Sequence, residues 1–341
     1  MSQYPDLFFR PNLSSTGQIP ADGPLTTCPD IIIGDVTPIP NFQTALATPD
    51  SYAQDYGNSV QLGMDNYFYV RGKNGGASSV TRQISMYYMP NAVINWPIQW
   101  FQNNLLTASG GKSVTVTDLP AGAIGVGSEA LIWRQVPPPP AGSDHYCLMS
   151  YATDPANPKP IPGTNGMTYE DMGALITNDL SFGWKNIVLV DVGAPTWTYN
   201  QMLTVPASTP EAKTVHIYVS CTGFQGASVS FQSSSQEGSS GPIALPQTTI
   251  TSPNIILGTT VTLQPGFSSS ITVNFWSNGI TPQTGSTIDL EAAYDPDGDA
   301  ELASAKKRGL VNTRFKEAMS LGVGITPSNP IYLGRVRYKA V

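Results

Sequence analysis

The sequence predicts an all-β protein built from two antiparallel immunoglobulin-like β-sandwiches, with a short helix and strand appended at the C-terminal end. Short runs of β-branched and aromatic residues recur along the chain, and turn clusters such as Ser233–Gly241 separate them. The chain contains 32 Gly and 30 Pro, residues that favour such turns. They do not follow the Gly-X-Y repeat of collagen. The length of 341 residues, 40% of them hydrophobic, is enough for two domain cores.

An N-terminal arm over residues 1–28 precedes the first domain. It is irregular and rich in Pro and Gly, so we expect it to extend from that domain or to cross it as a strap. The first sandwich is expected over residues 29–193 and opens with the apolar run Ile31–Ile33. Four prolines at 137–140 form a stiff loop, because proline cannot lie inside a central strand.

The pair Asn74-Gly75 predicts a β-hairpin, because it lies between the strand patterns NYFYVR at 66–71 and TRQISMYY at 81–88. Residues 89–119 form an insertion that a minimal sandwich domain does not have. The strand pattern does not indicate where in the fold this insertion lies. The later strands of this domain are expected at Ser113–Thr117, Ala130–Trp133, His145–Tyr151 and Asn186–Val192.

The second sandwich is expected over residues 194–296, with the break between the domains near Asp191–Trp197. Regular strand spacing with turns between the strands again indicates an all-β sandwich. Its strands are predicted at Met202–Val205, Thr214–Ser220, Ala227–Phe231, Ile255–Leu263, Ser270–Phe275 and Thr287–Ala292.

The remaining residues, 297–341, predict a helix and then a strand. Asp297 or Asp299 can cap the helix, and Gly322 can end it. The apolar stripe of the helix is Leu302, Leu310, Val311, Phe315 and Met319. The strand is expected at Ile331–Tyr338, where the apolar face changes parity at Gly334 and so indicates a bulge.

Two stretches resemble known families. The segments PDIII at 29–33 and NYFYVRGKNGGASSVTRQISMYY at 66–88 resemble CARDB-like bacterial adhesion domains. The segment VTLQPGFSSSITVNFWSNGITPQTGSTIDLEAAYDPDG at 261–298 resembles another immunoglobulin-like repeat, found in bacterial surface proteins and secreted hydrolases. The resemblance implies sandwich domains that act as spacers, adhesins or accessory modules, and it brings no catalytic residues.

The net charge of −7 argues against general nucleic-acid binding, which needs a clustered basic surface. The charge is uneven along the chain. From Asp299 to Val341 there are eight Lys/Arg and three Asp/Glu, which give a net charge of +5. Residues 1–298 therefore hold nine Lys/Arg and 21 Asp/Glu, which give a net charge of −12. The basic tail is either a solvated helix or an arm that docks on an acidic surface, such as a neighbouring copy. Its candidate partner-binding residues are Lys306, Lys307, Arg308, Arg335 and Arg337.

The sequence offers little for catalysis. A Ser/Cys-His-Asp triad would have to use His145 or His216. His145 lies beside Asp144 and Cys147, but strand alternation puts His145 and Cys147 on one face, where they fill space. The G-x-S-x-G, H-E-x-x-H, P-loop and dinucleotide motifs are absent from the sequence. We therefore expect a protein that is not an enzyme.

Adjacent carboxylates at Glu170 and Asp171 follow Thr168, which can cap a helix that begins there. A short solvated helix is the favoured interpretation. Glycosidase chemistry would require another carboxyl group at a defined separation.

The three cysteines, Cys28, Cys147 and Cys221, are too few for a disulfide scaffold, and their wide spacing excludes the usual zinc patterns. They are expected to be buried free thiols. The alternative is one disulfide, for which Cys28 and Cys147 are the preferred pair.

An aromatic cluster, Trp96, Trp100 and Phe101, is the candidate ligand-binding site. In a helix Trp96 and Trp100 would share one face, and an exposed aromatic platform can stack on a glycan or dock a protein. The alternative is a loop folded onto the sandwich edge, with its aromatic rings buried.

A calcium site is the candidate at Asp295, Asp297 and Asp299, because alternate acids place hard oxygen ligands on one side of a turn. The spacing falls short of an EF-hand loop, and a turn followed by a helix cap is the alternative. No other cofactor is expected.

These features favour a structural or assembly protein that joins copies or protein partners through its termini. The alternative is a binding or targeting module, such as a lectin-like adhesin or a component of a secreted toxin or injected cargo. The first residues lack a basic region followed by a long apolar run, and no stretch of about 18 apolar residues occurs. We therefore expect a chain made in the cytosol and, if it acts outside a bacterial cell, exported by a signal-independent route.

Overall fold

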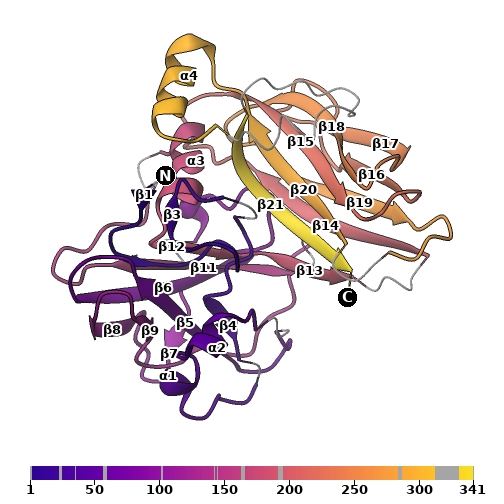
Figure 1. Cartoon of the computed structure of the whole chain (residues 1–341). Coiled ribbons are helices and arrows are strands. Elements are labelled where there is room, and N and C mark those ends of the chain that lie inside the picture. Colours follow the sequence, from indigo (N-terminus) through magenta and orange to yellow (C-terminus); the bar gives the residue numbers. More distant parts are fainter. Residues whose placement is uncertain are drawn as a thin grey trace.

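The computed structural model describes residues 2–22, 25–34, 36–56, 60–100, 103–141, 143, 145–162, 166–190, 195–282, 286–311 and 330–340. Figure 1 shows two β-sandwiches, one drawn in indigo and purple and the other in pink, orange and yellow, with helices α3 and α4 at one end. The predicted all-β, two-sandwich fold is confirmed.

The first sandwich has two sheets. One has the order β2-β5-β10-β7, with β4 and β9 also pairing with β5, and the other has the order β12-β11-β6-β8. Its strands are β2 (Leu7–Phe8), β4 (Ile31–Ile33), β5 (Asn66–Asn74), β6 (Val80–Pro90), β7 (Leu106–Thr107), β8 (Val114–Leu119), β9 (Ile124–Val126), β10 (Leu131–Trp133), β11 (Tyr146–Thr153) and β12 (Phe182–Lys185). Its helices are α1 (Phe42–Ala45), α2 (Pro49–Tyr52), the 3-10 turn η1 (Pro97–Gln99) and α3 (Tyr169–Asn178).

The predicted hairpin at Asn74-Gly75 is wrong, because β5 and β6 lie in different sheets. A two-residue type I′ turn needs positive φ at both of its central residues, and neither Asn74 nor Gly75 has it. The Asn74 side chain instead donates to the carbonyl oxygens of Ser78 and Leu119, at 2.8 and 2.9 Å. These bonds hold the chain as it crosses from one sheet to the other.

The N-terminal residues lie against the first sandwich as a strap. Strand β1 (Ser2–Gln3) pairs with β3 (Gln18–Ile19), and β2 pairs with β5 of the sandwich. Phe8 and Phe9 are buried, and the Phe9 amide donates to the Leu180 carbonyl at 2.7 Å. Arg10 is buried in an ion pair with Asp30, so the strap is anchored by both apolar and charged contacts.

The second sandwich consists of a five-stranded sheet, β13-β21-β20-β15-β18, and a four-stranded sheet, β14-β19-β16-β17. Its strands are β13 (Ile187–Val190), β14 (Thr196–Thr204), β15 (Lys213–Thr222), β16 (Ser228–Ser233), β17 (Ala244–Thr249), β18 (Asn254–Leu263), β19 (Ser268–Trp276), β20 (Thr287–Tyr294) and β21 (Ile331–Ala340). The chain enters this sandwich at β13, directly after β12, whereas the sequence placed the change of domain near 191–197.

The C-terminal strand β21 is more than an appendage, because it lies inside the five-stranded sheet. It pairs in parallel with β13 and antiparallel with β20. Ala292 pairs with Gly334, and the next residue, Ala293, pairs with Tyr332. Leu333 is therefore the extra residue of a bulge, as the parity change at Gly334 predicted.

Both helices at the end of the molecule begin near the predicted caps. Thr168 and Asp171 form a capping box at the start of α3, which confirms Thr168 as its cap. Helix α4 (Gly298–Lys307) begins after Asp297 but ends earlier than predicted, because Gly309 takes a φ of +69°. Phe315 and Met319, the last residues of the predicted stripe, lie outside the described residues.

The unplaced insertion of the first domain forms the junction with the second. Ala92 bridges Met202 of β14 in parallel, and the Val93 amide donates to the Met202 carbonyl at 2.7 Å. The Trp96 indole N–H donates to the Thr204 carbonyl at 2.8 Å. One continuous apolar core contains residues of both sandwiches, so the two domains are packed into one body.

Candidate functional site

The predicted aromatic platform is not exposed. The side chains of Trp96 and Trp100 are 1% and 0% exposed, and the Trp100 ring stacks on Phe182 with 5.0 Å between centroids. A glycan or a docking protein needs an open ring face, so Trp96 serves the domain junction instead and Trp100 packs within the first domain. Phe101 lies outside the described residues.

The three acids of the candidate calcium site do not converge. Asp297 binds the ammonium group of Lys213 at 2.9 Å, and Asp295 faces the His216 Nε2 atom at 3.3 Å. Asp299 lies exposed in the first turn of α4. Within the described ranges, no three His, Cys, Asp or Glu side chains gather as metal ligands do. A lysine and a histidine therefore occupy the positions next to these carboxylates.

Two of the predicted partner-binding residues are already paired inside the chain. Arg337 donates to both carboxylate oxygens of Asp289 at 2.8 Å, and the buried Arg335 lies 3.4 Å from the same carboxylate. An arginine in a buried pair offers no free charge to another protein, which corrects the prediction for Arg335 and Arg337.

The basic end of α4 docks on an acidic surface of the same chain. Arg308 lies 3.3 Å from Glu170 and 3.6 Å from Asp171, both in the first turn of α3. Lys306 and Lys307 remain exposed at the end of α4. Arg308 is therefore paired within the chain, with the acidic first turn of α3.

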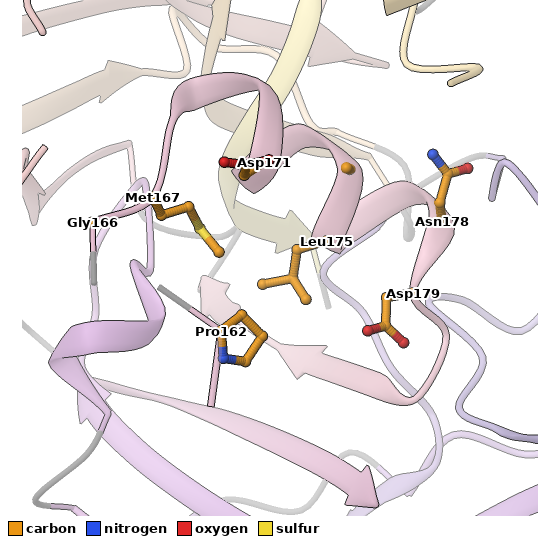
Figure 2. Close-up of a pocket in the computed structure, with 8 residues that line it drawn as sticks. Pro162, Gly166, Met167, Asp171, Leu175, Asn178 and Asp179 are labelled. Atoms are coloured by element: carbon orange, nitrogen blue, oxygen red, sulfur yellow. The ribbon is translucent and has the colours of Figure 1, made fainter. Parts of the chain in front are cut away.

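A hollow of about 430 Å³ lies beside α3 (Figure 2). Met167, Leu175 and Pro162 line it with apolar groups, and Asp171 and Asp179 add carboxylates. Both acids have partners within the chain, since Asp171 belongs to the capping box and Asp179 accepts from the Tyr4 hydroxyl at 2.9 Å. The hollow is therefore lined by α3 and its flanking residues in the first domain, and both of its acids are already engaged within the chain.

His216, Cys147 and Cys221 lie in strands, whereas His145 lies directly before β11 and Cys28 lies before β4. His145 Nε2 lies 3.1 Å from the Asn186 side-chain oxygen, while Asp144 lies outside the described residues. His216 lies between Asp295 and the Thr260 hydroxyl, which is 2.9 Å from Nδ1. A hydroxyl, an imidazole and a carboxylate thus lie in a row, but Thr260 is in a regular strand rather than on the sharp turn that exposes a nucleophile. All three cysteines are buried and form no disulfide, and the Cys147 thiol donates to the Asn91 side-chain oxygen at 3.3 Å.

Glu291 is a buried carboxyl group on β20 that faces the Tyr218 hydroxyl at 3.4 Å. Removal from water raises the pKa of Glu291 to about 7, although Arg335 nearby opposes the shift. Its pKa in the unfolded chain is near 4.5, so the folded state takes up a proton between these values. This group therefore lowers stability as the pH rises from about 4.5 to about 7, and the loss is complete above that.

We expect Glu291→Gln to remove this pH dependence. The free energy of unfolding of the variant should exceed that of the wild type at pH 8, because no charge must be buried, and the difference should shrink at pH 5. Urea unfolding at the two pH values measures it. A difference that does not change between pH 5 and pH 8 would show that Glu291 is not the group that titrates.

The edge strand β14 is the candidate interaction surface. It has nine residues, TWTYNQMLT, without a charge or a proline. Thr196, Thr198 and Asn200 are exposed, while Trp197 and Tyr199 are half-buried. Natural edge strands are usually short or carry Lys, Pro or a bulge, because an open edge can pair with another chain. Strand β14 has none of these protections.

The register shows which backbone groups point out of the sheet. Met202 pairs with Ser270 of β19, yet its N–H and C=O bond to Asn91 and Val93 of the junction. Met202 is therefore in a non-hydrogen-bonded pair of the antiparallel ladder, where both groups point outward. Strand alternation gives Asn200, Thr198 and Thr196 the same outward orientation.

The edge is half covered. The junction segment bonds the outward groups of Met202, and the Trp96 indole bonds the Thr204 carbonyl. Among the described residues, the outward backbone groups of Thr196, Thr198 and Asn200 have no hydrogen-bond partner. The stretch 196–200, called here the open segment for the outward backbone groups of Thr196, Thr198 and Asn200, thus lies next to a part of the strand that already accepts an added chain.

Aromatic rings stand behind the open segment. Trp197 stacks on Phe275 with 4.7 Å between centroids, and Tyr199 packs on Tyr338 of β21 at 4.9 Å. Both rings remain partly exposed at the rim of the sandwich. Backbone groups for pairing and aromatic surface for packing are therefore offered together.

The other edges of the second sandwich differ from β14. Strand β17 carries Pro246, which removes a backbone donor. In β18 the turn at Ser240 covers one end by bonding both backbone groups of Thr262. Strand β18 nevertheless keeps Thr260 exposed, so it supplies a matched control edge.

Sequence reasoning missed this surface. The predicted strand began at Met202, and Thr196 and Trp197 were assigned to the domain break. The alternation of Thr196, Thr198 and Asn200 with Trp197 and Tyr199 was a usable signal for a longer strand. Which strand lies at an edge, however, depends on pairing with distant segments.

No helix within the described part of the chain combines the length and apolar character needed to span a bilayer. No family model and no curated protein sequence matches the chain.

Solved structures give low-scoring similarities. The collagen adhesin CNA from S. aureus is 11% identical over 82% of this chain and 88% of its own, with a TM-score of 0.23. The calcium binding domain CBD12 of CALX1.1 is 8% identical over 80% of this chain and 93% of its own, with a TM-score of 0.18. Red sea bream transglutaminase is 14% identical over 68% of this chain, which spans 27% of that protein, with a TM-score of 0.19. These scores carry no conclusion about what this chain binds.

Proposed function

We propose that this chain is a non-enzymatic structural protein that assembles with other chains, copies of itself or protein partners, by strand addition at the β14 edge. The observation that carries the proposal is the open segment 196–200, whose outward backbone groups have no partner among the described residues. Main-chain hydrogen bonds to an added strand supply affinity, and the side chains on either face supply selectivity.

Two further features support an assembly role. The junction segment shows that this edge accepts an added chain, since Ala92 already bridges Met202. The shared core of the two sandwiches holds the edge in a fixed orientation relative to the first domain. An edge held in a fixed orientation meets its partner in a defined geometry, which a specific assembly requires.

We expect Thr198→Pro to abolish association of the full chain. Proline removes the outward N–H of residue 198 and places its ring at the open edge, while the bonds between β14 and β19 use the neighbouring residues. Light scattering after size exclusion, at increasing protein concentration, measures the mass. The wild type should exceed the monomer mass at high concentration, and the variant should not.

Two controls separate the edge from other causes. Thr198→Ala removes the hydroxyl and methyl groups, including the hydroxyl that donates to Asn274 at 2.8 Å, but it keeps the backbone N–H. This variant should associate like the wild type. Thr260→Pro introduces the same ring on β18 and should also associate. A wild-type chain that stays monomeric at every concentration would contradict assembly of copies, and association that survives Thr198→Pro would contradict the β14 edge.

A further inference from the structure

The open segment of β14 is complementary to itself. If two copies pair antiparallel about Thr198, Thr196 lies opposite Asn200 of the second copy and Thr198 lies opposite its equivalent. On the other face Trp197 lies opposite Tyr199. Polar residues then meet on the exposed face and aromatic residues meet at the rim, and both kinds of cross-strand pair are favourable.

Charge also favours a second copy. A two-fold axis brings each surface patch against the same patch of the partner, so a charged strand would meet its own charge. The segment TWTYN holds no Asp, Glu, Lys or Arg. Like charges directly opposite one another destabilise a strand pair, and this strand avoids that cost.

The length of the open segment sets the register. The junction segment occupies the edge at Met202, so a second strand can extend only as far as Asn200. Pairing about Thr198 places Thr196 of the second copy opposite Asn200, the last open residue. The outward backbone groups of Thr196, Thr198 and Asn200 are then used in both chains, and a shift along the strand would leave some of these groups unpaired.

We propose that two copies of this chain join through β14, antiparallel and centred on Thr198, so that the two four-stranded sheets become one eight-stranded sheet. This inference rests on the proposed function, and it names the partner as a second copy in one register. The contact is isologous and closes on itself, so the β14 edge yields a dimer rather than a filament.

Cysteine cross-linking tests the register. Opposite residues of a hydrogen-bonded antiparallel pair have Cα atoms about 5.5 Å apart, within the range that a disulfide bridges. Thr196→Cys and Asn200→Cys are prepared as separate full-length proteins and oxidised with copper phenanthroline, alone and mixed. The native cysteines are buried, so the new thiols are the accessible ones.

We expect a disulfide-linked dimer in the mixture and neither variant to form one alone. In a dimer of Thr196→Cys with itself, the two new thiols would lie roughly 14 Å apart, four residues along a strand. Thr198→Cys alone should cross-link to itself. Adding Thr198→Pro to both members of the mixture should abolish the dimer.

The outcomes separate this inference from the proposed function. If the chain associates and Thr198→Pro prevents it, but the mixture does not cross-link, the symmetric pairing is wrong while assembly at β14 stands. If each single variant cross-links alone as readily as the mixture, the register is wrong. If the chain does not associate and no variant cross-links, both proposals fail together.

Discussion

Asp30→Asn should lower the free energy of unfolding by about 3–5 kcal/mol, the range found when a buried ion pair loses one partner. Asp30 is 0% exposed and lies between the guanidinium groups of Arg10 and Arg71, which are 4% and 0% exposed. The Arg10 side chain donates to the Asp30 carboxylate at 2.6 Å, and Arg71 Nε donates to it at 3.2 Å. Asparagine would leave two buried cations with no anion between them.

The large loss of stability expected for Asp30→Asn follows from the number of hydrogen-bond donors that face the Asp30 carboxylate. The Arg10 backbone N–H also donates to Asp30, at 2.8 Å, so one carboxylate receives bonds from the strap and from β5. An asparagine amide keeps the shape but turns one acceptor into a donor that faces other donors. The strap should therefore loosen first, and urea unfolding followed by circular dichroism measures the total loss.

Asp6→Asn is the matched control. Asp6 makes a bidentate pair with Arg82, but the two side chains are 34% and 18% exposed. Partly solvated pairs contribute about 0–1 kcal/mol, so this variant should change stability little. Equal losses in Asp6→Asn and Asp30→Asn would show that burial does not decide the effect.

The fold class could be predicted because strand alternation and turn residues are local. The bulge at Gly334 was readable for the same reason, since one extra residue shifts the side-chain parity along a single strand. The Asn74-Gly75 hairpin was mispredicted because the sequence shows a turn but not which sheet each flanking strand joins. The central place of β21 likewise depends on pairing with β13, about 150 residues earlier by their numbering.

The candidate sites could be predicted less well, because pairing in space decides what a charged or aromatic residue does. Asp297 was a reasonable calcium ligand in sequence, but Lys213, 84 residues away, takes its carboxylate. Arg337 was a reasonable contact for a partner, but Asp289 takes its guanidinium group. Trp96 was a candidate platform, yet the second sandwich covers it. None of these partners is visible from local spacing.

The junction of the two sandwiches depends on one residue without a side chain. A Cβ atom on Gly334 would lie 1.9 Å from the Val93 carbonyl oxygen and 3.1 Å from the Ile94 Cα atom. Both contacts are with backbone atoms, which cannot turn aside as a flexible side chain can. The close approach of β21 to the junction segment therefore requires glycine at this bulge.

Gly334→Ala should cost about 3 kcal/mol or more, at the upper end of the range for overpacking, because relief of the clash must move the junction segment. Movement of Val93 would break its 2.7 Å bond to Met202 and withdraw the segment that covers half of β14. The variant should therefore unfold at lower urea and show a larger radius of gyration by X-ray scattering.

The matched control is Gly241→Ala, since a Cβ atom at Gly241 would meet nothing within 4 Å. This variant should leave stability within about 0.5 kcal/mol of the wild type, as surface substitutions usually do. If Gly334→Ala behaves like this control, the contact with Val93 is not what joins the domains. If it separates the sandwiches, the exposed edge of β14 should lengthen toward Thr204, and association through that edge should lose its single register.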